Sequence, residues 1–480
     1  MHELKTITLL LSLLLTCAVA TAADIASAPG QTLDSPPTQA LPDAATPLQN
    51  AVPVQASTPA PDHTAPPAPL PEHAPNADTP TALETAPPSA LTQDRPEPAA
   101  TQTTATPDRD DLTTAAIAGD VQAQLKLADQ FTAAGDHASA IQWWQAAAQQ
   151  GSIAAQLRLA DVYLTGQGVP QNVATAVEWY GRAAHGGDAL AQRQLADAYA
   201  SGQGVAADQA QAVHWYHAAA EQGEPTAQLR LAAAYWTGQG VPQDYATAVH
   251  WYRSAAEQNE KLAQLALGVA YSEGRGVGLD QAEAGRWFAL AAAQGNVDSQ
   301  AKLGAAYLAG KGVPQDYAQA VQWLRKASDQ GNAQAALLLG ESYQEGKGTA
   351  QDPLQAAEQF LRAALQNEPS AQTYLALAHY YGRGVPQNYG EAFTWLSKAA
   401  ESGHVPAQLL LGEMYYFGQG VPQSYDKAYM WTNIAAARAT GERREAVVRL
   451  RDALAEVLTA DQVARAQAQA AEKMQQHGVR

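Results

Sequence analysis

The chain has 480 residues, with 47 acidic and 29 basic side chains that give a formal charge of −18. This acidic surplus disfavours nucleic acid as a partner, because nucleic-acid binding depends on Lys and Arg side chains that neutralise phosphates. The single cysteine, Cys17, excludes disulfide bonds within the chain and metal sites built from several thiolates.

The first 22 residues predict an export signal peptide. A short polar start that ends at Lys5 precedes an apolar run over 7–15, and small residues at Ala18, Ala20 and Ala22 provide cleavage sites. The apolar run is too short to span a bilayer stably. We therefore expect an exported, periplasmic protein.

Cys17 leaves a second interpretation of this signal open. The segment Leu14-Leu15-Thr16-Cys17 resembles the signal of bacterial lipoproteins, in which the cysteine becomes the lipidated first residue. Thr16 departs from that motif, which normally has Gly, Ala or Ser at this position. Lipidation at Cys17 would give a membrane-anchored lipoprotein, and only in that case do we expect contact with a membrane.

Residues 23–111 predict a disordered linker rich in Pro, Ala and Thr. Between Pro29 and Pro107 lie 19 of the 28 prolines, and the segment holds 12 acidic and two basic residues. Such a composition cannot bury enough apolar surface to offset the entropy lost on ordering. The linker is either a semi-extended tether for the C-terminal body or a spacer that makes no contacts of its own.

From residue 112 onward the sequence repeats with a period of 36 residues. A Tyr stands three residues before a Gly-x-Gly tripeptide in seven of eight units, and a Trp recurs at the same spacing. The tripeptide begins at Gly166, Gly202, Gly238, Gly274, Gly310, Gly346, Gly382 and Gly418. Such a period is typical of stacked repeat units, and we expect the recurring Tyr and Trp at core positions.

Each unit predicts two helices. In 151–186, Leu159 and Tyr163 lie on one apolar stripe of helical period, and the first helix ends at Gly166, with Gly168 in the return of the chain. The second helix begins after a strong N-cap residue, which is Asn172, Asp208, Asp244, Asp280, Asp316, Asp352, Asn388 or Ser424. Each unit then ends at a residue that tolerates a left-handed conformation, namely Gly151, Gly187, Gly223, Asn259, Gly295, Gly331, Asn367 or Gly403.

This pattern resembles the Sel-1-like repeat, a longer relative of the tetratricopeptide repeat. The unit 223–258 shows it in nearly full form, with Ala227, Leu231, Ala232, Tyr235, Gly238, Gly240, Val241, Asp244, Trp251 and Tyr252. The resemblance implies an all-α solenoid superhelix of about nine stacked antiparallel helix pairs over 112–436. We expect the structural residues of the repeat to include Tyr163, Gly166, Gly168, Trp179, Tyr235, Gly238, Gly240 and Trp251.

The two ends of the array and one internal unit depart from this pattern. The first unit, 119–150, is four residues short between its helices, looks closer to a tetratricopeptide unit and predicts an N-terminal cap. The unit 331–366 has Thr349 and Gln359 where Val and Trp are usual, which predicts a softer point in the stack. Residues 437–480 predict capping helices that cover the last repeat, the second of which opens with a Thr459-x-x-Gln462 capping box.

No motif in the sequence predicts a chemical site. The segment Gly274–Gly278 could be mistaken for a phosphate loop, but its equivalents in the other units indicate a connection between helices. His214 and His250 occupy equivalent positions in successive units without a clustered ligand beside them in the sequence. We therefore expect no catalytic residue, no cofactor and no metal.

A surface remains as the candidate site. The position of the first helix that we expect to be exposed becomes apolar late in the chain, at Leu338, Tyr374 and Leu410. The aromatic residues that could anchor a partner are Trp236, Tyr374, Tyr380, Tyr381, Tyr416 and Phe417. The alternative is that these rings pack between adjacent repeats or under the capping helices.

The resemblance implies a non-enzymatic protein-interaction scaffold or adaptor of the bacterial cell envelope that holds a protein or peptide on its concave face. One alternative is a lipidated envelope spacer that works mainly through its linker. Another is an enzyme-like relative of the cysteine-rich members linked to penicillin binding, whose cysteine pairs this chain lacks.

Overall fold

The structure is a computed structural model that describes residues 109–476. The expected signal peptide over 1–22 and the linker up to residue 108 lie outside the described residues, as do residues 477–480. Every regular element between residues 109 and 476 is an α-helix, from α3 to α23. The predicted all-α fold of repeated helix pairs is thus confirmed.

The described residues fall into two compact units, 109–155 and 156–476, and each is described by itself. The shorter unit contains α3 (Arg109–Ile117), α4 (Val121–Ala133) and α5 (His137–Gln149). Leu112 of α3 is buried and packs with Leu127 of α4. Helical structure therefore begins at Arg109, slightly before the predicted end of the linker at residue 111.

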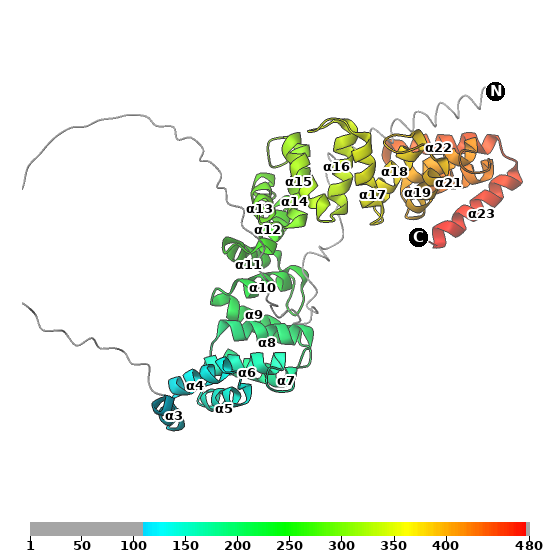
Figure 1. The fold of residues 1–480 in the computed structure, drawn as a ribbon. Coiled ribbons are helices and arrows are strands. Elements are labelled where there is room, and N and C mark those ends of the chain that lie inside the picture. The colour runs from blue at the N-terminus through cyan, green and yellow to red at the C-terminus, as the bar shows by residue number, and fades with distance from the viewer. Residues whose placement is uncertain (1–108, 477–480) are drawn as a thin grey trace, which may run out of the picture. The chain divides into compact units, whose positions relative to one another are not determined.

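The longer unit is a row of helix pairs that follow one another in chain order, as the colour change in Figure 1 shows. The first helices are α6 (Ile153–Thr165, which starts in the shorter unit), α8 (Ala189–Ser201), α10 (Pro225–Thr237), α12 (Lys261–Glu273), α14 (Val297–Ala309), α16 (Ala333–Glu345), α18 (Pro369–Tyr381) and α20 (Val405–Phe417). The second helices are α7 (Val173–His185), α9 (Gln209–Glu221), α11 (Tyr245–Glu257), α13 (Gln281–Ala293), α15 (Tyr317–Asp329), α17 (Pro353–Ala364), α19 (Tyr389–Glu401) and α21 (Tyr425–Arg438). From α7 to α21, each helix packs against the next one along the chain.

The predicted N-caps of the second helices are confirmed. In α11, the Asp244 carboxylate accepts hydrogen bonds from the backbone N–H groups of Ala246 and Thr247, at 3.0 and 3.2 Å. The backbone N–H of Asp244 in turn donates to the carbonyl of Tyr235, at 2.9 Å, which ties the loop to the end of the first helix. The same backbone bond recurs in the other repeats, so each loop has one defined conformation.

The junctions between repeats take the left-handed conformation that the sequence predicts. Asn259 and Asn367 have φ of +66° and +64° and are the two residues other than glycine with positive φ in the described part of the chain. Asn tolerates this conformation better than other non-glycine residues because its short amide bonds locally. The restriction of this junction position to Gly or Asn therefore reflects the left-handed backbone conformation that the junction requires.

The core lies between the two helices of each pair and differs from the prediction at the recurring Trp. Trp179 and Trp251 are half-buried, whereas the residue that follows each of them, Tyr180 or Tyr252, is buried. Consecutive residues on a helix point about 100° apart, so only one of the two can face the first helix. Tyr163 and Tyr235 are also half-buried. These recurring aromatics border the core, and alanines and leucines fill most of it.

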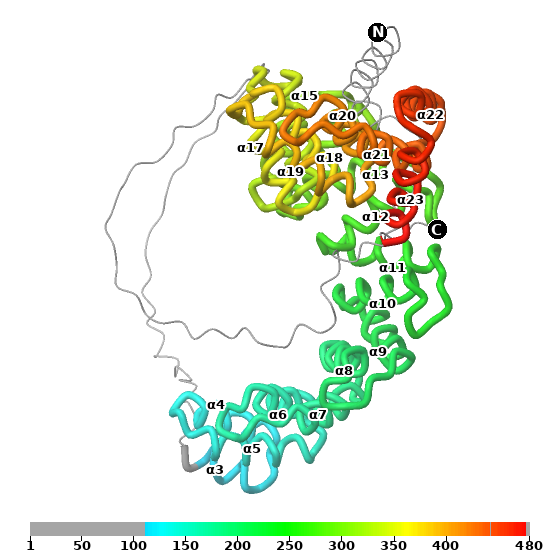
Figure 2. The backbone as a smooth tube through the Cα atoms, turned by 90° about the vertical axis from the view of Figure 1, so that its right-hand side faces the viewer, coloured from blue at the N-terminus to red at the C-terminus, as the bar shows by residue number. Residues whose placement is uncertain are grey.

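Two closing helices, α22 (Gly441–Glu456) and α23 (Ala460–Gln476), cover the last pair. Both pack against α21, and Figure 2 shows them beside it. Leu450 of α22 and Ala466 of α23 are completely buried in this contact. The predicted capping box is present, because Thr459 N–H donates to Gln462 Oε1 at 2.9 Å and Gln462 N–H donates to Thr459 Oγ1 at 3.3 Å.

Candidate interaction surface

Five first helices carry an acidic residue at the same position of the repeat, namely Asp129, Asp161, Asp197, Glu341 and Glu413. The Tyr180 hydroxyl donates to Asp161 at 2.7 Å, and the Tyr216 hydroxyl donates to Asp197 at 2.6 Å. Burial raises the pKa of Tyr374 on the next first helix, and the Glu341 charge raises it further. Burial raises the pKa of Glu341 and of Glu413 to about 7.

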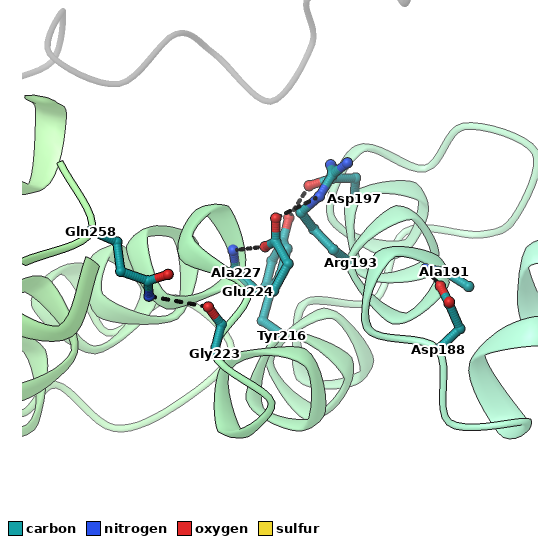
Figure 3. A network of polar contacts seen from close by, with 9 residues as sticks. All are labelled: Asp188, Ala191, Arg193, Asp197, Tyr216, Gly223, Glu224, Ala227 and Gln258. Carbon is teal, nitrogen blue, oxygen red and sulfur yellow. Dashed lines mark hydrogen bonds and ion pairs between the residues drawn. The ribbon is translucent and has the colours of Figure 1, made fainter. Parts of the chain in front are cut away.

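The early repeats combine such a pair with further charges, as Figure 3 shows. Arg193 pairs with Asp197 at 2.7 Å and with Glu224 at 3.5 Å, and Asp197 also accepts from Tyr216. Glu224 accepts the backbone N–H of Ala227 at the start of α10. Each charge in this network has an opposite charge nearby, so the network links adjacent repeats.

Three of the six predicted anchor residues are buried, which corrects their assignment to an exposed surface. Trp236 packs edge-to-face on Tyr245 and Tyr252, with ring centres 4.9 and 6.0 Å apart. Tyr374 stacks on Phe360 at 4.8 Å. Tyr416 is 3% exposed. These rings fill space within and between repeats, as the alternative interpretation expected.

The first-helix position that was expected to be exposed is also covered late in the chain. Tyr374 and Leu410 are buried, and Leu338 is half-buried. Each of these side chains is large and apolar enough to reach the neighbouring first helix, whereas the equivalent Arg158 and Lys302 extend into solvent.

The remaining three predicted anchors lie on the surface of the last two repeats. Tyr381 and Phe417 are 41% and 39% exposed and end the first helices α18 and α20, at equivalent positions of adjacent repeats. Tyr380 is half-buried and packs edge-to-face on Tyr381 and Tyr389, with ring centres 4.9 and 5.1 Å apart. We call Tyr380, Tyr381 and Phe417 the aromatic edge.

A ladder of buried glutamines also joins the repeats, and the sequence analysis missed it. Gln264 is 1% exposed, its side-chain N–H donates to the Ala256 carbonyl at 3.2 Å, and its oxygen accepts from Gln294 at 2.8 Å. The first-helix members with the same bond to the preceding helix are Gln124, Gln192, Gln228, Gln264, Gln300, Gln372 and Gln408. Their recurrence with the 36-residue period could have revealed the ladder in the sequence. Glutamine is usually an exposed residue, however, so a glutamine on an alanine-rich helix suggests a side chain in solvent.

The ladder is interrupted in the unit that was predicted to be softer. Ala336 stands at the glutamine position there. Gln359, which replaces the usual Trp, is buried and accepts a hydrogen bond from the Ser328 hydroxyl at 2.6 Å. A different buried polar contact therefore joins this unit to the one before it.

We expect Gln264→Leu to lower the free energy of unfolding by about 1–2 kcal/mol, because one buried and one partly buried hydrogen bond are lost and Gln294 loses its acceptor. Urea unfolding followed by circular dichroism measures the change. Gln239→Leu, at an exposed position, is the matched control. If the two variants unfolded at the same urea concentration, the ladder would have no energetic role. The double variant Gln264→Leu/Gln294→Leu should lose less unfolding free energy than the sum of the losses in the two single variants.

Two further features of the described residues bear on the kind of site present. None of the helices between residues 109 and 476 is both long and apolar enough to cross a membrane. In the same range, no three His, Cys, Asp or Glu side chains gather in a way that could hold a metal ion.

Comparison with known protein families identifies the repeat. The family model of the Sel1 repeat matches nine consecutive segments, 121–152, 153–188, 189–224, 225–260, 261–296, 297–332, 333–368, 369–404 and 405–439. The chain is a Sel1-repeat protein. The first matched segment is the short unit that carries α4 and α5, and the last ends just after α21.

Solved structures with similar folds support this assignment. One is c5321, a protective antigen of uropathogenic Escherichia coli described as displaying an SLR fold, with 29% identity and a TM-score of 0.52 over 77% of this chain and 95% of that one. Another is a Sel1 repeat protein from Oxalobacter formigenes, with 33% identity and a TM-score of 0.51 over 64% of this chain and 89% of that one. Comparison with curated proteins gave no match. Sel1-repeat proteins generally act as protein-interaction scaffolds.

Proposed function

We propose that this Sel1-repeat protein is a non-enzymatic scaffold that binds a protein partner in the bacterial cell envelope through the aromatic edge of its last two repeats. The observation that carries the proposal is the exposure of Tyr381 and Phe417 at equivalent positions of adjacent repeats. Large aromatic side chains at the surface supply much apolar contact area at a small entropic cost, and they are enriched at the centre of protein interfaces.

The rings of the aromatic edge are held in place by further aromatic residues. Tyr380 lies between Tyr381 and Tyr389, and Tyr416 lies between Phe417 and Tyr425 with ring centres 5.0 and 5.2 Å apart. Each exposed ring therefore rests on a packed one, which limits its motion before a partner arrives. Such preorganisation lowers the entropy lost on binding.

The position in the cell and the role of the linker belong to the same proposal. The signal-like segment over 1–22 supports export to the periplasm, and lipidation at Cys17 would add a membrane anchor. The linker over 23–111 would then let the repeats reach a partner at a distance from that anchor. A ligand on the concave face, which solenoids commonly form from their first helices, would lie near the ends of α18 and α20.

The proposal is tested by capture of partners from envelope extract. We expect the full chain to retain a specific protein and the double variant Tyr381→Ala/Phe417→Ala to lose it, since the substitutions remove the exposed rings and leave the packed ones. The matched control is Leu354→Ala/Leu361→Ala, which removes exposed apolar side chains from α17. Circular dichroism must first show equal helicity in all three proteins.

The outcomes separate two surfaces. Retention by the parent and the leucine variant, with loss by the ring variant, places the binding site on the aromatic edge. If the ring variant retains the same proteins as the parent, the aromatic edge is not the binding site. Loss in the leucine variant alone would move the site to the outer face of α17.

A further inference from the structure

One exposed face of α17 carries three leucines in a single stripe. Leu354, Leu361 and Leu365 are 54%, 41% and 67% exposed. An α-helix turns by about 100° per residue, so these three positions lie within about 40° of one another around the axis. Leu365 follows the last residue of α17 but keeps helical backbone angles, with φ of −64° and ψ of −22°. We call these three side chains the leucine stripe.

The leucine stripe belongs to this repeat alone. None of the other second helices, from α7 to α21, has a leucine at an equivalent position. On the two neighbouring second helices the equivalents are Ala318, Arg325 and Asp329 of α15 and Gly390, Ser397 and Glu401 of α19. Those repeats form the same helix pair, so the fold does not require leucines there. An apolar stripe on an otherwise polar surface is typical of a protein contact.

Two exposed charged residues border the leucine stripe on its α15 side. Glu358 and Arg362 lie about 40° and 80° around the helix axis from Leu354. One guanidinium nitrogen of Arg362 donates to Asp329 of α15 at 2.9 Å, which shows that this flank faces α15. The guanidinium has five N–H donors, so it can bind a second carboxylate as well.

The spacing of these side chains makes the face of α17 complementary to itself. Two antiparallel copies of α17, related by a two-fold axis level with residue 360, place Glu358 of each copy opposite Arg362 of the other. The two charges meet because this symmetry brings the same flank of both helices together. Leu361 then faces Leu361 of the second copy, and Leu354 lies opposite Leu365 of the second copy to within one residue, or about 1.5 Å.

We propose that the leucine stripe binds a second copy of this chain, in a two-fold symmetric dimer with antiparallel α17 helices. Every contact then occurs twice, which closes the assembly at two copies. A contact through one helix face is smaller than the standard interface of about 1,600 Å², so we expect a weak dimer with a Kd of about 10–100 μM. The inference goes beyond the proposed function, because the aromatic edge lies on α18 and α20.

Sedimentation velocity of the full chain at roughly 1–300 μM tests the dimer. We expect the parent to associate within this range and Leu361→Asp to raise the Kd at least about tenfold, because two aspartates would face each other at the axis. The matched control is Leu290→Asp on α13, since Leu290 is 50% exposed and lies outside the leucine stripe. Its Kd should equal that of the parent. Circular dichroism should first show equal helicity in all three proteins.

Charge reversal tests the antiparallel register. Glu358→Arg alone brings like charges together twice, and so does Arg362→Glu alone, so each variant should dimerise about tenfold more weakly than the parent. An equimolar mixture of the two variants restores both pairs of opposite charges, and it should form a heterodimer with about the parent Kd. A parallel pair of helices would bring different flanks together and would give no such recovery.

Four results would overturn the inference: a parent that stays monomeric throughout, unchanged association in Leu361→Asp, an equal loss in Leu290→Asp, or a mixture of the charge variants that does not associate. A monomeric parent whose Leu361→Asp variant loses a protein captured from envelope extract would show that another protein covers the leucine stripe. The proposed function is tested separately, by Tyr381→Ala/Phe417→Ala, and would stand or fall on that capture alone.

Discussion

Gly312→Ala should lower the free energy of unfolding by roughly 3 kcal/mol or more, which is among the largest effects of a single methyl group in this protein. Gly312 is the second glycine of its loop and has φ of +79°. A Cβ atom at this position would lie 1.9 Å from the carbonyl oxygen of Gln281, at the start of the preceding second helix α13. Both the backbone conformation and the contact between repeats would have to change.

The control for this prediction is Gly295→Ala. Gly295 has φ of +81° but no atom lies within 4 Å of the Cβ that it would gain. In Gly295→Ala, the loss of unfolding free energy should come only from placing alanine in the left-handed conformation and should be about 1–2 kcal/mol. Thermal unfolding gives the overall difference, and hydrogen exchange should show the loss of protection in α13 and α14. Similar costs for the two variants would mean that the close contact with Gln281 has no effect.

Phe360→Ala should lower the free energy of unfolding by about 3–5 kcal/mol, because it leaves a cavity between three helices. Phe360 is 1% exposed and stacks on Tyr374 of α18 at 4.8 Å. A Cβ atom at Gly340 of α16 would lie 2.6 Å from this ring, so the ring packs directly on that helix. The loss should appear as a lower urea midpoint in circular dichroism.

Phe417→Ala is the matched change at an exposed phenylalanine. Phe417 is 39% exposed, and its truncation should alter the unfolding free energy by only about 0.5 kcal/mol. A large loss of stability in Phe417→Ala would show that this ring is part of the core and would remove it from the aromatic edge. A small loss in Phe360→Ala would mean that the neighbouring side chains fill the cavity.

The sequence predicted well those features that depend on residues close together in the chain. Asp244 at the start of α11 and Asn259 at a repeat junction each satisfy a backbone requirement within a few residues. The 36-residue period then repeats each requirement, so the helix pairs and their ends could be located from the sequence. The capping box could be predicted for the same reason, because Thr459 and Gln462 lie within one helical turn of each other.

The exposure of the aromatic residues could not be predicted in the same way. Trp236 and Tyr380 hold the same position of the repeat, yet Trp236 is buried and Tyr380 is half-buried. Their surroundings depend on which side chains the next helices supply, and the order of residues within one repeat does not contain that information.

The glutamine ladder and the glycine contacts reach only from one repeat to the next. Gln294 bonds to Gln264 across 30 residues, and Gly312 meets Gln281 of the repeat before it. Removal or duplication of a whole 36-residue unit would therefore rejoin equivalent contacts at the new junction. The array could lengthen or shorten during evolution by unequal recombination, while the last two repeats and their aromatic edge pass unchanged to the descendant protein.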